Sequence, residues 1–300
     1  MQHLRFLRYF DEVARAGSIR QAAERLHVAP SAVNRRIQDL EEELGVALFE
    51  RMPRGMRLTA AGELFVQYVR SRASALDLVR SQIEELQGLR RGNVRLVASQ
   101  ALAPEFMPRL ISGFRSSRPL VEFQVRIGDH EQALSALRAF EAEIALVFNL
   151  TASEDLEVVA QIEQRLLVMM HRTHPLAQKA GGIRLRECMN FPLVLPNREV
   201  GGRQLLERYL QRSSIKLRPV VESNSFEFLR ACLYRDQAIS FQIAIGAVSD
   251  GGELVAREIT DRQFPGGHLC VAHLRGRQLP LVAHAFIEHA VSALSTSSIP

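Results

Sequence analysis

The sequence predicts two folded parts: a mainly α-helical winged helix-turn-helix at the N-terminus and an α/β domain, joined by a long linker helix. Three observations predict this fold class. Two short helical segments separated by a tight turn lie within residues 18–45. Residues 60–90 lack proline and carry a seven-residue apolar spacing, and residues 93–300 alternate between strand and helix patterns. We therefore expect domains at 1–59, 60–92 and 93–300.

The helix pair begins with a capping pattern. Ser18 is suited to accept a hydrogen bond from the backbone three residues later, and Gln21 to reach back, so we expect a helix to start near Ile19. Pro30 suits the first turn of a second helix, and Gly45 suits its left-handed end. The apolar positions of the two helices fall on one face of each: Ile19, Ala22, Ala23 and Leu26, then Val33, Ile37, Leu40 and Leu44.

The opposite face of the second helix is polar. It carries, in order, Pro30, Ser31, Asn34, Arg35 and Gln38. Side-chain amides read adenine edges, arginine reads guanine or holds phosphate, and serine does either. This layout is typical of a helix that lies in the major groove of duplex DNA. The alternative is an ordinary solvated helix face, which short polar stripes commonly form.

Residues 49–59 follow the helix pair and predict a small β-wing. Arginines recur at every third position, as Arg51, Arg54 and Arg57, around a proline and a glycine. Basic groups at the tip of a hairpin suit phosphates or a narrow minor groove. A charged hairpin without function is the alternative. The position directly after the helix pair favours contact with DNA.

These segments resemble the LysR-type transcriptional regulators. The resemblance rests on several motifs: Leu4-Arg5-Phe6-Leu7-Arg8-Tyr9-Phe10, Ala22-Ala23-Glu24-Arg25-Leu26-His27-Val28, Leu40-Glu41-Glu42-Glu43-Leu44-Gly45-Val46, Leu48-Phe49-Glu50-Arg51 and Leu58-Thr59-Ala60-Ala61-Gly62. It implies a sequence-specific regulator that binds double-stranded DNA. Two features depart from the family, which usually opens its recognition helix with Ser-Gln-Pro and later has Ser. Here the residues are Ala29-Pro30-Ser31 and Asn34, so the resemblance transfers no half-site sequence.

Residues 60–90 contain two interleaved apolar series. Their members are Val69, Leu76 and Ile83, and Phe65, Arg72, Val79 and Leu86, of which the charged Arg72 is the imperfect member. Such spacing predicts the seam of a coiled coil, and hence a dimer formed through this helix. We expect a homodimer or homotetramer that also uses the domain at 93–300, where an effector is expected to bind. The alternative is a helix packed on its own domain. Since no apolar segment lies nearby in the sequence to cover the helix, we favour a dimer arm. Arg90-Arg91-Gly92 is the expected hinge.

The remainder predicts parallel strands with helical crossovers. Residues 94–98, 121–127 and 144–148 read as strands separated by helices, and a second such series follows. The family resemblance implies two α/β lobes like those of periplasmic binding proteins. Lobe one would span 93–163 and 268–300, and lobe two 164–267.

Strand ends of both lobes predict the site of a small-molecule effector. In open α/β sheets ligands bind beyond the carboxyl ends of strands, and the family resemblance brings those ends together in one cleft. The expected effector residues are Ser99, Gln100, Gly128, Asp129, Asn149, Gly202, Arg203 and Asn224. Ser99 and Gln100 suit a carboxylate at a helix entry, and Arg203 is the expected counter-charge beside the exposed backbone of Gly201-Gly202. Each also has a structural interpretation, as a helix cap or a solvated charge.

One departure bears on this site. The family often has Gly-x-Gly-Ile near the last strand of the cleft, whereas this chain has Asp236-Gln237-Ala238-Ile239. The close approach of the backbone to a ligand is therefore uncertain on this strand, and a regulator that needs no effector stays open.

Composition and motifs exclude several classes. The formal net charge is +5, which suits a polyanionic partner. Cys188, Cys232 and Cys270 are too far apart for a disulfide framework or a metal site, so buried reduced thiols are favoured over a redox sensor. No signal-peptide core or membrane-length apolar run is present, which predicts a cytoplasmic protein without membrane contact.

Two rival functions are disfavoured. For an enzyme, we find no nucleophile elbow, phosphate loop, metal cluster or dinucleotide fingerprint, so no catalytic residue, metal or cofactor is expected apart from an unidentified effector. A secreted solute-binding protein is disfavoured because we find no signal peptide and because the two-lobed fold of that class does not account for the first 60 residues.

Overall fold

The structure is a computed structural model that describes residues 2–53, 55–86, 91–151, 153–235, 237–247 and 252–296. The chain forms two compact units, a smaller one that extends to Arg80 and a larger one that holds nearly all of the rest. Arg54, Asp236 and residues 87–90 lie outside the described residues, so of the expected hinge Arg90 is not described and Arg91 and Gly92 are. The side chain of Leu86 is not described either.

The N-terminal unit is a winged helix-turn-helix, as the sequence predicts. Its elements are α1 (Gln2–Ala16), α2 (Ile19–Leu26), α3 (Pro30–Leu44), β1 (Phe49–Met52), β2 (Gly55–Leu58) and the first part of α4 (Ala60–Leu86). Ser18 caps α2, because its Oγ accepts from the Gln21 amide at 3.4 Å. Gly45 ends α3 in the left-handed conformation, with φ 66°. The core contains Phe10, Ala22 and Val33, which are fully buried.

The wing is a hairpin held against the helical part by one backbone hydrogen bond and by one side chain. Strands β1 and β2 pair antiparallel. The Met56 amide donates to the Gly17 carbonyl at 2.7 Å, and a Cβ on Gly55 would lie 2.3 Å from the same oxygen, so only glycine fits there. On the other side, one carboxylate oxygen of Glu41 on α3 accepts from the amides of Leu48 and Phe49, at 2.8 and 3.1 Å. The start of β1 is therefore tied to α3.

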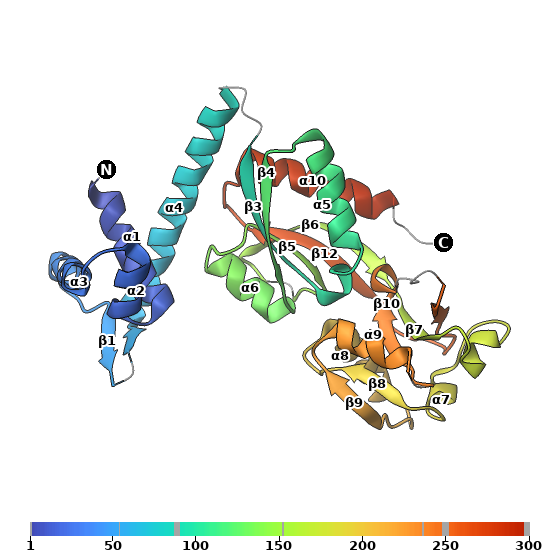
Figure 1. Cartoon of the computed structure of the whole chain (residues 1–300). Coiled ribbons are helices and arrows are strands. Elements are labelled where there is room, and N and C mark those ends of the chain that lie inside the picture. Colours follow the sequence, from blue (N-terminus) through green and yellow to red (C-terminus); the bar gives the residue numbers. More distant parts are fainter. Residues whose placement is uncertain are drawn as a thin grey trace. The chain divides into compact units, whose positions relative to one another are not determined.

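Part of the coiled-coil seam predicted on helix α4 is wrong, because two of its apolar residues pack inside the N-terminal unit. Phe65 packs edge-on against Phe10 with ring centroids 4.9 Å apart, and Val69 is buried in the same core. These two side chains are covered by α1, which is far away in the sequence. The absence of an apolar segment near α4 in the sequence was therefore no reason to expect its whole apolar face to be free. The large apolar side chains of α4 that stay exposed are Leu64, Tyr68, Val79 and Ile83. Figure 1 shows the continuous length of the helix.

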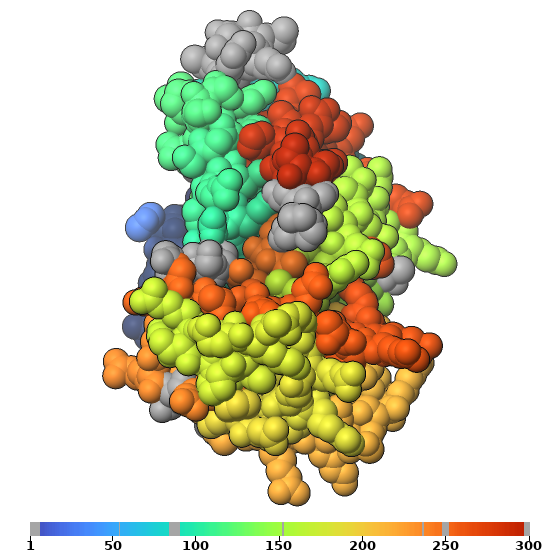
Figure 2. Space-filling model, turned by 90° about the vertical axis from the view of Figure 1, so that its right-hand side faces the viewer, coloured from blue at the N-terminus to red at the C-terminus, as the bar shows by residue number. Residues whose placement is uncertain are grey.

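The first lobe of the larger unit is built on a mixed sheet with strand order β4-β3-β5-β12-β6. Strands β3, β4 and β5 are parallel, whereas β12 runs antiparallel between β5 and β6. Helices α5 and α10 lie side by side (Figures 1 and 2), with the rings of Phe114 and Phe286 5.3 Å apart. The elements are β3 (Gly92–Ala98), α5 (Phe106–Ser117), β4 (Val121–Ile127), α6 (His130–Arg138), β5 (Ile144–Phe148), β6 (Leu156–Gln164), β12 (Gly267–Leu274) and α10 (Leu281–Thr296).

The second lobe departs from the expected repetition of parallel strands. Only β8 and β9 form a parallel strand pair among its described strands, and β7 pairs antiparallel with both β10 and β11. The sequence interpretation missed β6 and β11, whose polar residues interrupt any continuous apolar run. The elements are β7 (Leu166–His171), α7 (Leu185–Cys188), β8 (Leu193–Pro196), α8 (Gly201–Leu210), β9 (Pro219–Ser223), α9 (Phe226–Leu233), β10 (Ser240–Ile243) and β11 (Leu254–Glu258).

Short 3-10 turns complete the larger unit: η1 (Gln100–Leu102), η2 (Pro175–Gln178) and η3 (Ala244–Gly246). The chain passes between the lobes from β6 to β7 and again from β11 to β12. At the first crossing the Gln164 side chain is buried, and its Oε1 accepts from the Ile245 amide at 2.9 Å. Within the described residues, no helix is long and apolar enough to span a bilayer.

The cysteines are free thiols rather than parts of a disulfide. Cys188 and Cys270 are buried, and Cys232 is half-buried. Burial raises the pKa of Cys188 to about 12, helped by the negative charge of Glu187 and Asp261, and burial also raises the pKa of Cys270. Both thiols therefore stay protonated near neutral pH, which makes them poor nucleophiles.

Candidate DNA interface and interlobe cavity

Helix α3 presents its predicted polar face to the surface. Pro30, Ser31, Arg35 and Gln38 are exposed, and Asn34 is half-buried. Among the residues that the structure describes, Arg35 has no ion pair or hydrogen-bond partner, whereas the neighbouring Arg36 pairs with Asp39 at 3.2 Å. The guanidinium of Arg35 is thus available to an external anion.

Arg51 lies beside α3 rather than at the tip of the wing. Its Nη2 donates to Oδ1 of Asn34 at 2.9 Å. The anchoring of β1 on Glu41 explains this position, because the strand starts against α3 and carries Arg51 along the helix. The expectation that the wing arginines act as one basic tip is wrong for this residue.

The other two wing arginines differ from Arg51. Arg57 donates from Nη2 to Glu50 Oε2 at 2.8 Å, and the two residues face each other across the hairpin. Its charge is therefore partly compensated within the wing. Arg54 lies outside the described residues.

A cavity of about 370 Å³ lies between the two lobes of the larger unit. Six of the eight expected effector residues line it: Ser99, Gln100, Gly128, Asp129, Gly202 and Asn224. They come from the ends of β3, β4 and β9 and from the start of α8, so the structure brings these expected residues together at one cavity. That a ligand binds there stays a prediction.

Lobe two contributes hydrogen-bond donors to the cavity from the start of α8 and from Gln242. Helix α8 begins at Gly201 and Gly202, and Val200 before it provides no side-chain cap, so backbone N–H groups stay open at its start. A Cβ on Gly201 would lie 3.1 Å from the Phe148 oxygen, which explains glycine there. Gln242 is only 7% exposed; its Oε1 accepts from the Ile243 amide, and its Nε2 has no partner among the described residues.

Two lining residues serve the protein as well as the cavity. Asp129 caps α6 reciprocally with Gln132, since each side chain accepts from the other residue's amide, at 2.8 and 3.1 Å. Ser99 Oγ accepts from the Phe148 amide at 3.0 Å, which leaves the hydroxyl proton to donate. The expected interpretation as a helix cap therefore holds for Asp129, whereas the Ser99 side chain gives η1 no cap hydrogen bond and contacts the end of β5 instead.

Gln100 joins the two lobes across the cavity. Its Oε1 accepts from the Phe226 amide at 3.0 Å, and its Nε2 donates to the Asn224 carbonyl. The side-chain amide thus pairs with the backbone of lobe two in the manner of a neighbouring strand. Both ends of Gln100 are occupied in this conformation.

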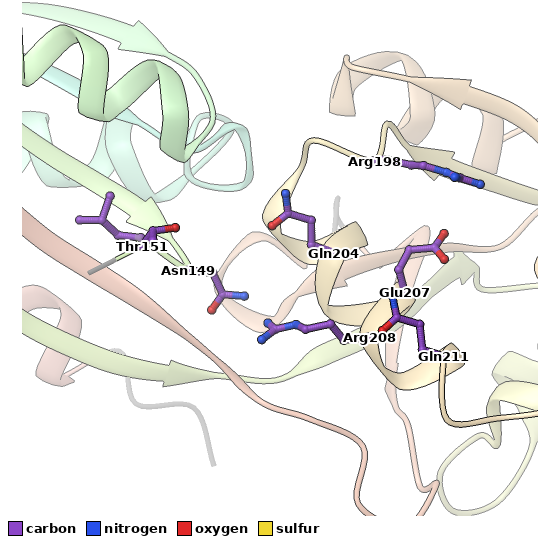
Figure 3. Close-up of a pocket in the computed structure, with 8 residues that line it drawn as sticks. Asn149, Thr151, Arg198, Gln204, Glu207, Arg208 and Gln211 are labelled. Atoms are coloured by element: carbon purple, nitrogen blue, oxygen red, sulfur yellow. The ribbon is translucent and has the colours of Figure 1, made fainter. Parts of the chain in front are cut away.

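Asn149 and Arg203 lie elsewhere. Asn149 follows β5 at φ 53°, and its Oδ1 accepts from the His268 amide at 3.0 Å. It lines a separate open hollow of about 710 Å³, where Arg208 extends from α8 toward it and Arg198 points away (Figure 3). The structure therefore brings Asn149 to a different surface from the other six residues.

Arg203 is buried in lobe two and does not supply the expected counter-charge. Its side chain is 2% exposed and contacts carboxylates of Glu207 and Glu222, each at 2.8 Å, and the Pro196 carbonyl at 3.1 Å. Because Cα–Cβ bonds on successive helix residues point in different directions, the backbone of Gly202 reaches the cavity while the next side chain points into the lobe.

The sequence interpretation missed Gln242, Glu199 and His130, which also line the cavity. Gln242 left a recognisable signal, a polar residue within the buried strand β10. His130 has a buried Nδ1 without a partner. Among the described residues, no lysine or arginine lines the cavity, and its acidic residues are Asp129 and Glu199.

Family comparisons match both parts of the chain. Residues 4–63 match the model for bacterial regulatory helix-turn-helix proteins of the lysR family, and residues 87–295 match the LysR substrate binding domain. The chain is 28% identical over 283 residues to the HTH-type transcriptional activator CmpR of Synechocystis sp., covering 93% of this chain and 92% of CmpR.

Solved structures show the same fold. A full-length OxyR variant from Pseudomonas aeruginosa is similar with a TM-score of 0.73 at 22% identity, covering 98% of this chain and 95% of OxyR. Full-length CbnR, solved in complex with its target DNA, is similar with a TM-score of 0.65 at 21% identity, covering 97% of this chain and 99% of CbnR. The substrate-binding model alone spans well over half of the chain. The chain belongs to the LysR family of DNA-binding transcriptional regulators, which are not enzymes.

Proposed function

We propose that this regulator binds its operator through α3 and the wing, and that a small carboxylate held between the lobes changes its affinity for DNA. The observation that carries the DNA part is the exposed polar face of α3, with the unpaired Arg35 on it and Arg51 beside it. Such a face supplies both base-reading groups and a phosphate contact. The chromosome is the target, so the cytoplasm is the proposed site of action.

The proposed oligomer uses the exposed side of α4. Leu64 is 72% exposed and Ile83 50% exposed, and Tyr68 and Val79 lie between them. Leaving such large apolar groups in water is unfavourable, and pairing two helices removes them from it. A two-fold dimer would read two related half-sites, and association of dimers would give a tetramer.

The chemistry of the interlobe cavity supports a carboxylate of low charge. The open N–H groups of Gly201 and Gly202 and the unpaired amide nitrogen of Gln242 are donors that suit an anionic oxygen. Asp129 and Glu199 repel additional negative charge, and no described cationic side chain offsets them. Hydroxyl groups on the ligand would pair with these acidic residues. A monocarboxylate that carries hydroxyl groups fits this set better than a sugar phosphate.

Two measurements test the proposal on the full-length protein. Capture and sequencing of bound genome fragments should return a small set of related sites, and uniform recovery of all fragments would contradict sequence-specific binding. In thermal unfolding experiments, glycolate, lactate or glycerate should raise the midpoint temperature of the protein more than glycerol phosphates do at the same concentrations. A larger shift with the phosphates would overturn the proposed ligand class.

A further inference from the structure

We propose that Arg51 reads a guanine in the operator half-site and that Asn34 is its positioning residue. The proposal rests on DNA binding by α3 and goes beyond it, because it assigns a base to a pair of residues. Asn34 stands where the family usually has serine, so the pair is a feature of this chain.

The geometry holds the Arg51 guanidinium over the half of α3 that enters the major groove. Glu41 fixes the start of β1 two helical turns further along α3, and the Arg51 Nη2 reaches Asn34 Oδ1 at 2.9 Å. Ser31 and Arg35 lie on the same exposed N-terminal half of the helix. In helix-turn-helix proteins this half carries the residues that contact base edges.

The hydrogen bond changes what Asn34 is able to read. A free asparagine recognises adenine by accepting from N6 and donating to N7. Here Arg51 occupies one of the two lone pairs of the Asn34 carbonyl oxygen, which turns that oxygen toward the wing and leaves the NH₂ group as the side chain's donor. Arginine has donors only. The pair therefore presents mainly donors, and the Arg51 guanidinium matches the two acceptors of guanine, O6 and N7, better than it matches adenine, whose N6 amino group is itself a donor.

The partner of Arg51 also distinguishes it from the other arginines nearby. Arg36 and Arg57 pair with carboxylates, which compensate their charge. Arg51 is held by a neutral amide, and it has no carboxylate partner among the described residues. It keeps its charge while its direction is restricted, as a bidentate contact to one base requires.

The test replaces one atom of the DNA. The full-length protein first selects its operator from randomised duplexes, and each specified guanine is then replaced by 7-deazaguanine, which lacks the N7 acceptor. One such replacement in each half-site should weaken binding by wild type about tenfold to a hundredfold. The Arg51→Ala variant should bind the two duplexes equally, because its contact to that atom is already lost.

Variants of Asn34 separate positioning from direct contact. Asn34→Ala should lose preference at the same base pair as Arg51→Ala. Asn34→Asp keeps an acceptor for Arg51 and should retain the guanine preference, although its added negative charge lowers affinity for every duplex. Arg36→Ala is the matched control, because Arg36 already pairs with Asp39, and it should leave the preference at this base pair unchanged.

Two results would overturn the proposal. One is a uniform loss of affinity for all duplexes in Arg51→Ala while the sensitivity to 7-deazaguanine persists, which would make Arg51 a phosphate contact only. The other is adenine as the selected base at the position that Asn34 and Arg51 control. Selection of no sequence at all by wild type would instead contradict the proposed function itself, together with this inference.

Discussion

The DNA face and the interlobe cavity are assembled in different ways. The DNA face comes from one short stretch, Pro30 to Arg57, in which helical periodicity decides what is exposed. The cavity gathers residues from Ser99 to Ile243, so the topology of two lobes decides which of them meet. Local pattern is therefore sufficient to find the first site, whereas the second requires knowledge of how strands are ordered.

The substitution with the largest expected effect should impair the DNA face and leave the interlobe cavity intact. Phe10 is fully buried between Phe49 and Phe65, with ring centroids 5.1 and 4.9 Å away. Phe10→Ala should destabilise the N-terminal unit by about 3–5 kcal/mol because it leaves a cavity there. Operator binding should fall with it, while thermal stabilisation of the larger unit by a carboxylate persists. Loss of both responses together would show that the sites are not independent.

The second change asks whether Arg203 serves the fold or the ligand. Its guanidinium lies between Glu207 and Glu222, which are themselves partly exposed. Arg203→Leu should lower the free energy of unfolding of the larger unit by about 2 kcal/mol, measured with urea, because the hydrogen bonds to β8 and β9 are lost. Carboxylate affinity should stay within about twofold, a difference of about 0.4 kcal/mol. A large loss of carboxylate affinity with an unchanged free energy of unfolding would show that Arg203 does supply the counter-charge for the ligand.

The third change concerns the donor that the cavity leaves unpaired. Gln242→Leu should weaken carboxylate binding about tenfold, since one hydrogen bond to a charged group is lost. The same substitution removes the acceptor of the Ile243 amide, so the free energy of unfolding of the variant should fall by about 1 kcal/mol. Gln211→Leu, on the open hollow of Figure 3, is the control and should bind like wild type. Equal affinities of the Gln242 variant and wild type would remove this residue from the site.

Some of these features could be predicted from the sequence and others could not. Ser18 and Gly45 were predictable because caps depend on a few neighbouring residues. Six cavity residues were predictable because strand ends carry ligands. The burial of Arg203 and the packing of Phe65 on Phe10 were not, because both depend on which distant segment supplies the partner. The tie between Gln100 and lobe two likewise exists only once the lobes are in place.

The thiols give the smallest expected effect. Burial holds the pKa of Cys188 near 12, well above neutral pH, so its reactive thiolate is scarce in the folded protein. Brief alkylation near neutral pH followed by peptide mass analysis should modify Cys232 first and leave Cys188 unmodified until the protein is unfolded. Rapid modification of folded Cys188 would favour a redox role instead.

The salt dependence of operator binding tests the central assignment, α3 as the DNA-binding surface. Arg35 is unpaired on that surface, and Arg36 is already paired with Asp39. Each phosphate contact contributes about 0.9 to the slope of log affinity against log salt concentration. In fluorescence anisotropy titrations of the full-length protein, Arg35→Ala should lower affinity and reduce that slope by about one, while Arg36→Ala stays close to wild type. Identical affinities and slopes in all three proteins would contradict the assignment.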